Sequence, residues 1–168
     1  MSWLLRVCWR TPYFRLEETV GYEALELSSA LKNLYAISCG YATGLNHGPN
    51  TTAQLITIAL GEFTLLTKAL KLKNYDPMAP GVVGDMLMTC SSEESRNFQY
   101  GLSLAEAAKT GEQPTAMQHT VEGFFTSHSI QAIAKQNGVL LPLAFLTHDI
   151  IENPTDSEAA FRRFFTSK

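Results

Sequence analysis

Most of the chain shows apolar residues at helical spacing. From Tyr22 onward they recur every three or four positions, which predicts a helix with one apolar face that ends at Gly44. This face consists of Leu27, Leu31, Leu34, Ile37 and Tyr41. A second helix, from about Thr51 to Lys71, has a broad apolar arc, so we expect it to be central in the fold. Asn50 is the expected N-cap of that helix.

Capping and turn residues divide the rest of the chain. Ser91 to Glu94 forms a capping box that predicts a helix ending near Gly111. A further helix is expected from about Thr120 to Gln136, and Pro142 suits the first turn of the next. The stretch from Thr155 to Glu158 is expected to cap the last. The pattern therefore predicts six or seven helices in one body.

The first 20 residues have a different pattern. Trp3 to Trp9 is rich in aromatic and branched residues, and Tyr13 to Leu16 alternates apolar with polar side chains. Such segments are typical of one or two short strands. The fold class we predict is all-α, a multi-helix bundle with a short β lead-in at its N-terminus.

Composition narrows the classes of function. The 168 residues, 45% hydrophobic and 17% charged, favour one globular domain. A net charge of -3 gives no reason to expect nucleic acid or an anionic membrane as a partner. The apolar start of the chain is interrupted by Arg6 and Arg10, which argues against a signal peptide. Cys8, Cys39 and Cys90 are too scattered for a disulfide framework, so we expect a cytoplasmic protein.

Several common motifs are missing from the sequence. Neither a dinucleotide-binding G-x-G-x-x-G nor a phosphate-binding G-x-x-x-x-G-K-[ST] occurs. The four histidines, His47, His119, His128 and His148, show no H-x-x-x-H spacing, and no carboxylate cluster suggests a metal site. The sequence therefore predicts no metal site.

Two polar residues, Lys32 and Asn33, interrupt the first apolar helix. Lys32 lies about 100° around the helix from Leu31, at the border of the apolar face. One interpretation is a lysine whose stem lies on the core while its ammonium reaches water. The other is a lysine that points inward for a function. The helix alone favours the first.

A second polar segment runs from Gly84 to Asn97. Asp85 and Thr89 are one helical turn apart and would share a face. Arg96 and Asn97 fall in the first turns of the capped helix, where a guanidinium can hold a phosphate or carboxylate. The alternatives are that Asp85 is a simple N-cap and that Arg96 lies on a solvated face. The sequence of this segment alone does not decide between the functional and the structural interpretation of either residue.

Taken in order, six separated segments resemble the motifs of NAD(P)-dependent sn-glycerol-3-phosphate dehydrogenase, in its C-terminal, substrate-binding domain. The segments are Glu26–Asn33, Gly44–Leu45, Asn50–Glu62, Gly84–Asp85, Thr89–Cys90 and Ser95–Asn97. Val121–Gly123 fits a further family segment. The resemblance runs from about residue 11 to 165. It implies a bundle of the 6-phosphogluconate dehydrogenase C-terminal-like type.

The resemblance also implies roles for individual residues. Lys32 would accept the proton when sn-glycerol 3-phosphate is oxidised to dihydroxyacetone phosphate with NAD or NADP as the hydride acceptor. The substrate would be bound by Asn33, Asp85, Thr89, Ser95, Arg96 and Asn97. The cofactor side would be formed by Arg96, Val121 and Glu122. A lysine can act as this base only if burial or a neighbouring cation lowers its pKa from about 10.4 toward neutrality.

The chain also departs from the family pattern. We expect residues 1–20 to be the remnant of the end of a nucleotide-binding domain and residues 21–168 to be the α-helical substrate-binding domain. The Rossmann half is then absent, so this chain alone would be incomplete for catalysis. The alternative is a catalytically inactive helical remnant or interaction module of the same descent. Exposed Trp3 and Trp9 would then suit a sticky surface or a contact in a homodimer.

Overall fold

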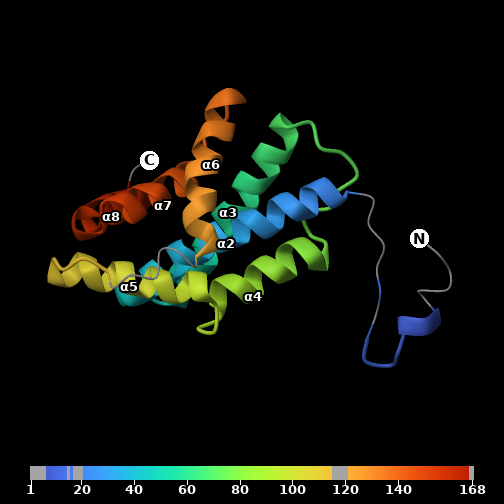
Figure 1. The fold of residues 1–168 in the computed structure, drawn as a ribbon, viewed down its shortest axis with the longest axis horizontal. Helices are drawn as coiled ribbons and strands as arrows, with labels where there is room; N and C mark the ends of the chain where they lie inside the picture. Colours follow the sequence, from blue (N-terminus) through green and yellow to red (C-terminus); the bar gives the residue numbers. More distant parts are fainter. Residues whose placement is uncertain (1–6, 15, 17–20, 115–120, 167–168) are drawn as a thin grey trace.

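The computed structural model describes residues 7–14, 16, 21–114 and 121–166. In these residues seven α-helices, α2 to α8, form the body of the molecule (Figure 1). They are α2 (Tyr22–Gly44), α3 (Pro49–Ala69), α4 (Asp85–Ser91), α5 (Arg96–Thr110), α6 (Glu122–Gln136), α7 (Pro142–Glu152) and α8 (Glu158–Thr166). The all-α prediction is confirmed. None of the described helices is long and apolar enough to span a membrane.

The N-terminal segment fits the predicted strands only in part. Thr11 and Phe14 form an isolated antiparallel bridge, whereas Val7 to Trp9 is helical where the first strand was expected to end. A strand needs a paired neighbour for its backbone groups, and the described residues offer this segment no sheet to join. Residues 1–6, with Trp3, lie outside the described part of the chain. In Figure 1 the described segment stands apart from the helical body.

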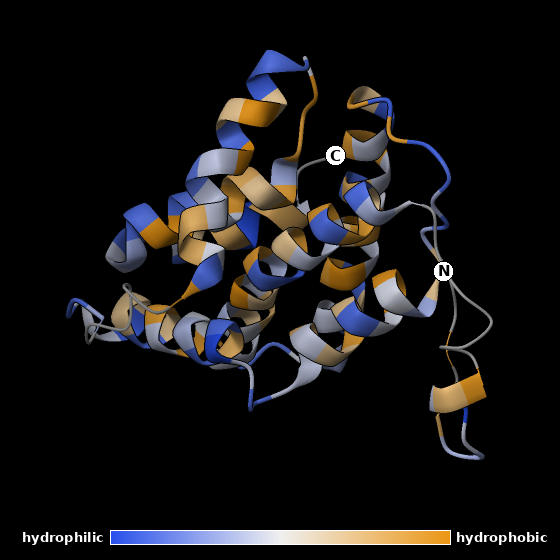
Figure 2. Ribbon diagram, turned by 45° about the vertical axis from the view of Figure 1, so that its right-hand side comes forward, coloured by the Kyte–Doolittle hydropathy of each residue, from blue (hydrophilic) through white to orange (hydrophobic). Residues whose placement is uncertain are grey.

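Helix α2 is the centre of the bundle. Every residue from Asn33 to Ala42 is buried, and α2 packs against α3, α4, α5, α6 and α7. Burial of apolar area on all sides explains why its apolar residues extend beyond one stripe. Figure 2 shows apolar positions gathered where the helices face one another. The polar residues of α2 that face inward therefore need partners on neighbouring helices.

Two glycines bring α2 and α5 into unusually close contact. A Cβ on Gly40 would lie 2.0 Å from the Phe98 carbonyl oxygen. A Cβ on Gly101 would lie 2.1 Å from the Ile37 carbonyl oxygen. Only glycine fits at these positions, so the two backbones are held almost in contact. This approach fixes the distance between side chains on the facing turns of both helices.

Some predicted helix boundaries hold and others shift. Helix α2 ends at Gly44, and Pro142 is the first residue of α7, as predicted. Helix α3 begins two residues before Thr51, so Asn50 lies inside its first turn and does not cap it. The N-cap of α3 is instead Gly48.

The predicted capping box at Ser91 is wrong. Ser91 is the last residue of α4, and the N-cap of α5 is Ser95, whose Oγ accepts a hydrogen bond from the Phe98 N–H at 3.4 Å. A turn in which the Ser95 N–H donates to the Ser92 carbonyl separates the two helices. Likewise Thr155, expected to begin a cap, lies in the 3₁₀ turn η3 (Pro154–Asp156) ahead of α8.

A buried carboxylate joins α3 to the start of α7. Glu62 Oε1 accepts from the Leu143 N–H at 2.5 Å, and Oε2 accepts from the Ala144 N–H at 3.1 Å. The Tyr35 hydroxyl donates to Oε2 at 2.8 Å. Glu62 thus satisfies two of the backbone donors that a helix N-terminus leaves unpaired. Burial raises the pKa of Glu62 above its ordinary value, although these three hydrogen bonds oppose the rise.

We expect Glu62→Gln to lower the free energy of unfolding by about 1–3 kcal/mol at neutral pH. Glutamine has one acceptor oxygen, whereas the two N–H groups reach different oxygens of Glu62. One buried donor would then face an NH₂ group. Denaturant unfolding would measure the loss, with Glu112→Gln, at an exposed carboxylate, as the control. Equal stability of the two variants would contradict this role of Glu62.

The same substitution should change the pH dependence of stability. Because the folded-state pKa of Glu62 is raised, the part of its contribution that depends on protonation is fully present below the ordinary glutamate pKa. This part is lost as pH rises through the folded-state pKa, whereas the hydrogen bonds from Leu143 and Ala144 remain. In this window the unfolding free energy of the wild-type chain should therefore fall more steeply with pH than that of Glu62→Gln.

Candidate functional site

Lys32 points toward a carboxylate and not into open water. Its Nζ lies 2.7 Å from both Oδ1 and Oδ2 of Asp85, across the contact between α2 and α4. The Lys32 side chain is only 19% exposed and that of Asp85 28%. Of the two interpretations of Lys32, the structure therefore supports the inward one. Two of the three ammonium donors serve Asp85, which leaves one for another acceptor.

A short π-helix, η1 (Pro80–Gly84), sets the position of Asp85. It runs directly into α4, so Asp85 has helical backbone angles and is the first residue of α4. Asp85 is therefore not a simple N-cap, which would have a non-helical backbone. Such wider turns are rare and occur frequently at functional sites. One turn later, the Thr89 hydroxyl donates to the Asp85 carbonyl at 2.7 Å.

A buried thiol supports the backbone at Lys32. Cys90 Sγ lies 3.8 Å from the Lys32 carbonyl oxygen, and its hydrogen bond with Cys39 together with burial raises the pKa of the Cys90 thiol well above its ordinary value. Both thiols are free and buried. A buried, protonated thiol is a poor nucleophile, so Cys90 serves packing at this site.

Asn33 and Asn97 form a directed chain of hydrogen bonds beside Lys32. The Gly123 N–H can only donate, and Asn97 Oδ1 accepts from it at 2.9 Å. Asn97 Nδ2 then donates to Asn33 Oδ1 at 3.1 Å. Asn33 Nδ2 donates in turn to Glu122 Oε2 at 2.8 Å and to the Ser29 carbonyl at 3.2 Å. Because the chain begins at a donor-only group and ends at acceptors, both amides have one orientation.

Gly123 allows α6 to begin against α2. A Cβ at this position would lie 2.5 Å from the Asn33 carbonyl oxygen and 2.8 Å from Ile37 Cδ1. Without a side chain, the first turn of α6 can place Glu122 within reach of Asn33. Val121, the N-cap residue of α6, is buried beside them. The start of α6 thus holds one edge of the site.

Arg96 is exposed at the N-terminus of α5. It follows the N-cap Ser95 directly, and its guanidinium forms no ion pair with Asp85 or Glu122, both of which belong to the described residues. The neighbouring Asn97 points inward to Asn33. A cation with several donors at a helix N-terminus, next to fixed amide groups, is suited to bind an anionic group.

The predicted residues fall into three groups in space. Hydrogen bonds join Lys32 to Asp85 in one group. A second set of hydrogen bonds joins Asn97, Asn33 and Glu122. Ser95, Arg96 and Val121 lie at the starts of α5 and α6, and Thr89 lies one turn into α4. Thr89 and Ser95 form hydrogen bonds with backbone groups of their own helices. The substrate and cofactor roles of all nine residues remain predictions.

Sequence reasoning did not assign a site role to Gly123 or Cys90. Gly123 takes part through its backbone N–H and through its missing side chain, and the only signal in the sequence was its place after Val121 and Glu122. Cys90 takes part through a contact with a residue 58 positions away. A spacing pattern within one segment cannot reveal such a contact.

Comparison with known proteins identifies one family. A sequence model described as the C-terminus of NAD-dependent glycerol-3-phosphate dehydrogenase matches residues 22–162. The glycerol-3-phosphate dehydrogenase (NAD(P)+) of Maridesulfovibrio salexigens is 36% identical over 150 residues, which cover 89% of this chain and 45% of that protein. The enzyme of the same name from Francisella tularensis subsp. novicida is 31% identical over 153 residues, 91% of this chain and 46% of that one.

A solved structure gives the same result for the fold. The crystal structure of glycerol-3-phosphate dehydrogenase from Coxiella burnetii matches with a TM-score of 0.80 and 27% sequence identity. The match covers 97% of this chain and 50% of that one. The chain thus spans about half the length of the curated relatives it matches.

Proposed function

The chain belongs to the family of C-terminal domains of NAD-dependent glycerol-3-phosphate dehydrogenases, and from this premise we propose that it binds the substrate and supplies the catalytic lysine for the interconversion of sn-glycerol 3-phosphate and dihydroxyacetone phosphate. The observation that carries the proposal is the inward Lys32, held at 2.7 Å by both oxygens of Asp85.

In this proposal Lys32 transfers the proton of the reacting hydroxyl. Oxidation of a secondary alcohol needs a group that accepts the hydroxyl proton, and the reverse reaction needs the same group to return it. Asp85 holds Nζ through two hydrogen bonds, so the remaining donor position has a fixed direction. Asp85 also has exposed carboxylate surface that could accept a hydrogen bond from a second substrate hydroxyl.

The phosphate would bind at the start of α5. Arg96 offers several N–H donors there, and Ser95 and the α5 N-terminus add polar groups beside it. Asn97, which follows Arg96 in the chain, donates a hydrogen bond to Asn33, which follows Lys32. Binding of the phosphate away from the reacting carbon would orient that carbon toward Lys32. Thr89, one turn from Asp85, would complete the substrate side.

For NAD or NADP the residues that the structure describes offer one edge of a site. Arg96, which has no ion pair among the described residues, offers a cation for a phosphate, and Val121 and Glu122 form the neighbouring start of α6. The bound nucleotide would supply the hydride acceptor. We propose that residues 21–168 are the α-helical substrate-binding domain and that residues 1–20 are the end of a nucleotide-binding domain with which it acts.

The remaining parts of the proposal concern the localisation, the partners and the assembly of the protein. We place it in the cytoplasm, with a small phosphorylated metabolite as its partner, on the strength of its family. A homodimer is the candidate assembly, supported by the exposure of Trp9, Tyr13 and Phe14 in the N-terminal segment. An inactive helical module of the same descent is the competing function, and the experiments on Arg96 and Lys32 separate the two.

We expect Arg96→Ala to weaken binding of sn-glycerol 3-phosphate by about 10- to 100-fold. Loss of hydrogen bonds to a charged phosphate costs about 1.5–3 kcal/mol, which corresponds to that change in affinity. Isothermal titration calorimetry on the full chain would measure it. Arg162→Ala is the matched control because Arg162 is an exposed arginine that pairs with Glu158 on α8. Binding that is absent in the wild-type chain, or equal in both variants, would contradict the phosphate site.

A further inference from the structure

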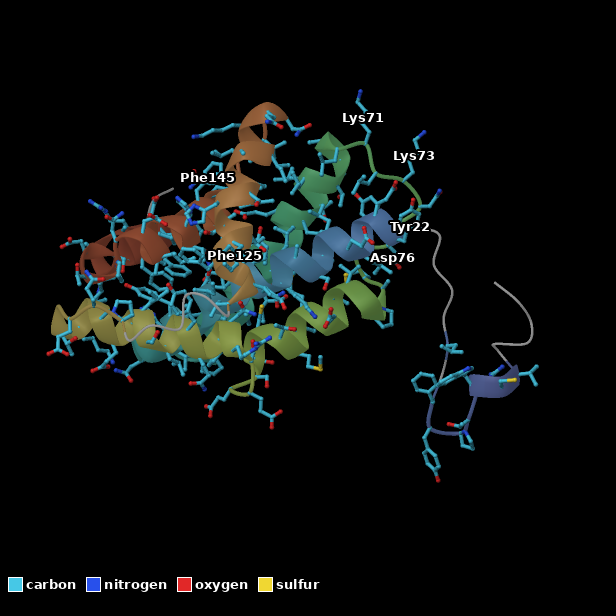
Figure 3. All side chains as sticks on the ribbon, viewed as in Figure 1. Tyr22, Lys71, Lys73, Asp76, Phe125 and Phe145 are labelled. Carbon is cyan, nitrogen blue, oxygen red and sulfur yellow. The ribbon has the colours of Figure 1, made fainter. Side chains whose placement is uncertain are left out.

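A second polar cluster joins α6 to α7 away from the proposed substrate site. His128 of α6 and His148 and Glu152 of α7 each place one potential ligand atom within 4.8 Å of those of the other two. His128 Nε2 lies 3.4 Å from Glu152 Oε1. Phe125 and Phe145, labelled in Figure 3, precede the two histidines by about one helical turn on α6 and α7. His148 and Glu152 are themselves one turn apart and share a face.

The hydrogen bonds of His148 favour metal binding through Nε2. The Ser127 hydroxyl donates to the Phe124 carbonyl at 2.7 Å, so its oxygen is free to accept. His148 Nδ1 lies 3.3 Å from this oxygen and therefore acts as the donor. In the neutral ring the lone pair then resides on Nε2. Metal-binding histidines are commonly oriented by such a hydrogen bond from their other nitrogen.

We propose that His128, His148 and Glu152 form a binding site for a zinc-type divalent cation that links α6 to α7. Two imidazoles and one carboxylate, with water as the fourth ligand, are a ligand set that zinc accepts in tetrahedral geometry. Tetrahedral ligand atoms about 2.0–2.1 Å from zinc are about 3.3 Å apart, and the pair formed by His128 and Glu152 already has this spacing.

The remaining ligand spacing can close by side-chain rotation. His128 and Glu152 have side chains that are 47% and 44% exposed, so both can rotate without disturbing the core. His148 is less exposed and is held by Ser127, so it provides the fixed ligand. Helix α6 also carries Glu122 and Gly123 at its start. A cation in this cluster would therefore fix α6, the helix that borders the substrate site, against α7.

Zinc titration of the metal-free full chain tests this proposal. We expect one equivalent of Zn²⁺ to bind by isothermal titration calorimetry, with a dissociation constant in the micromolar range or tighter, and to raise the melting temperature. His128→Gln and Glu152→Gln should each weaken binding at least roughly tenfold, and Ser127→Ala by about 10- to 100-fold through loss of the orienting hydrogen bond. Glu106→Gln, at an exposed carboxylate paired with Lys109, should leave the affinity unchanged.

Cobalt substitution separates this cluster from the cysteines. With Co²⁺ we expect the visible bands of a tetrahedral site and no thiolate-to-cobalt charge-transfer band, in the wild-type chain and in Cys8→Ser alike. His128→Gln and Glu152→Gln alter exposed positions, so circular dichroism should show an intact fold. No stoichiometric Zn²⁺ binding would overturn the proposal, and so would wild-type affinity in His128→Gln. In either case, His128 and Glu152 form only a contact between two side chains.

Discussion

Replacing Lys32 with methionine should lower kcat/KM for sn-glycerol 3-phosphate by about 10²- to 10⁴-fold. The test uses a fusion of this chain with the part of the Maridesulfovibrio salexigens relative that it does not match; the match covers 45% of that protein. Methionine keeps the length of the side chain but cannot transfer a proton. In the proposed role Lys32 transfers a proton more than it holds the substrate, so the loss should appear mainly in kcat, measured as substrate-dependent formation of NADH.

Two further variants show which property of Lys32 matters. Lys32→Arg retains a cation that can pair with Asp85, but a guanidinium does not release its proton in this pH range, so kcat should stay low. Lys68→Met removes an exposed lysine at the end of α3 and should leave kcat unchanged. Activity of the fusion that survives Lys32→Met would refute the proposed base. A folded fusion without activity would favour the inactive helical module.

Lys32 also shows how far the sequence alone can go. Its position at the border of an apolar face follows from helical geometry, but the helix alone favoured a lysine that reaches water. The deciding contact is with Asp85, 53 residues away, and depends on the π-helix η1 that places Asp85 on α4. No local pattern predicts a π-helix of five residues. The resemblance to a family, and not the periodicity, indicated the inward position.

The errors in the sequence predictions have a common physical cause. Asn50 and Ser91 are good capping residues, but the chain caps with Gly48 and Ser95 because packing of whole helices decides where each one begins. His128 and His148 were separate histidines in the sequence and become neighbours only because α6 and α7 pack together. The spacing of apolar residues therefore predicted most helices. Contacts between helices determined which residues cap them and which histidines become neighbours.

Gly101→Ala should destabilise the chain by about 3 kcal/mol or more, at the upper end of overpacking effects. The added Cβ would lie 2.1 Å from the Ile37 carbonyl oxygen and 2.7 Å from the Tyr41 backbone nitrogen. These are backbone atoms of the central helix, so a side-chain rotation cannot relieve the clash. Helices α2 and α5 must move apart, and the midpoint of denaturant unfolding should fall accordingly.

Gly61→Ala is the matched control because a Cβ at Gly61, inside α3, has nothing within 4 Å. It should stabilise the chain by about 0.5–1 kcal/mol, since alanine favours the helix over glycine. Gly101 lies one turn after Asn97 on α5, and Ile37 lies one turn after Asn33 on α2. The side chains of Asn97 and Asn33 are joined by a hydrogen bond of 3.1 Å. Any separation of α2 and α5 that relieves the clash must therefore stretch this bond. Gly101→Ala should thus weaken binding of sn-glycerol 3-phosphate even where the protein remains folded. Stability and binding equal to those of the wild-type chain would contradict the close approach of the two helices.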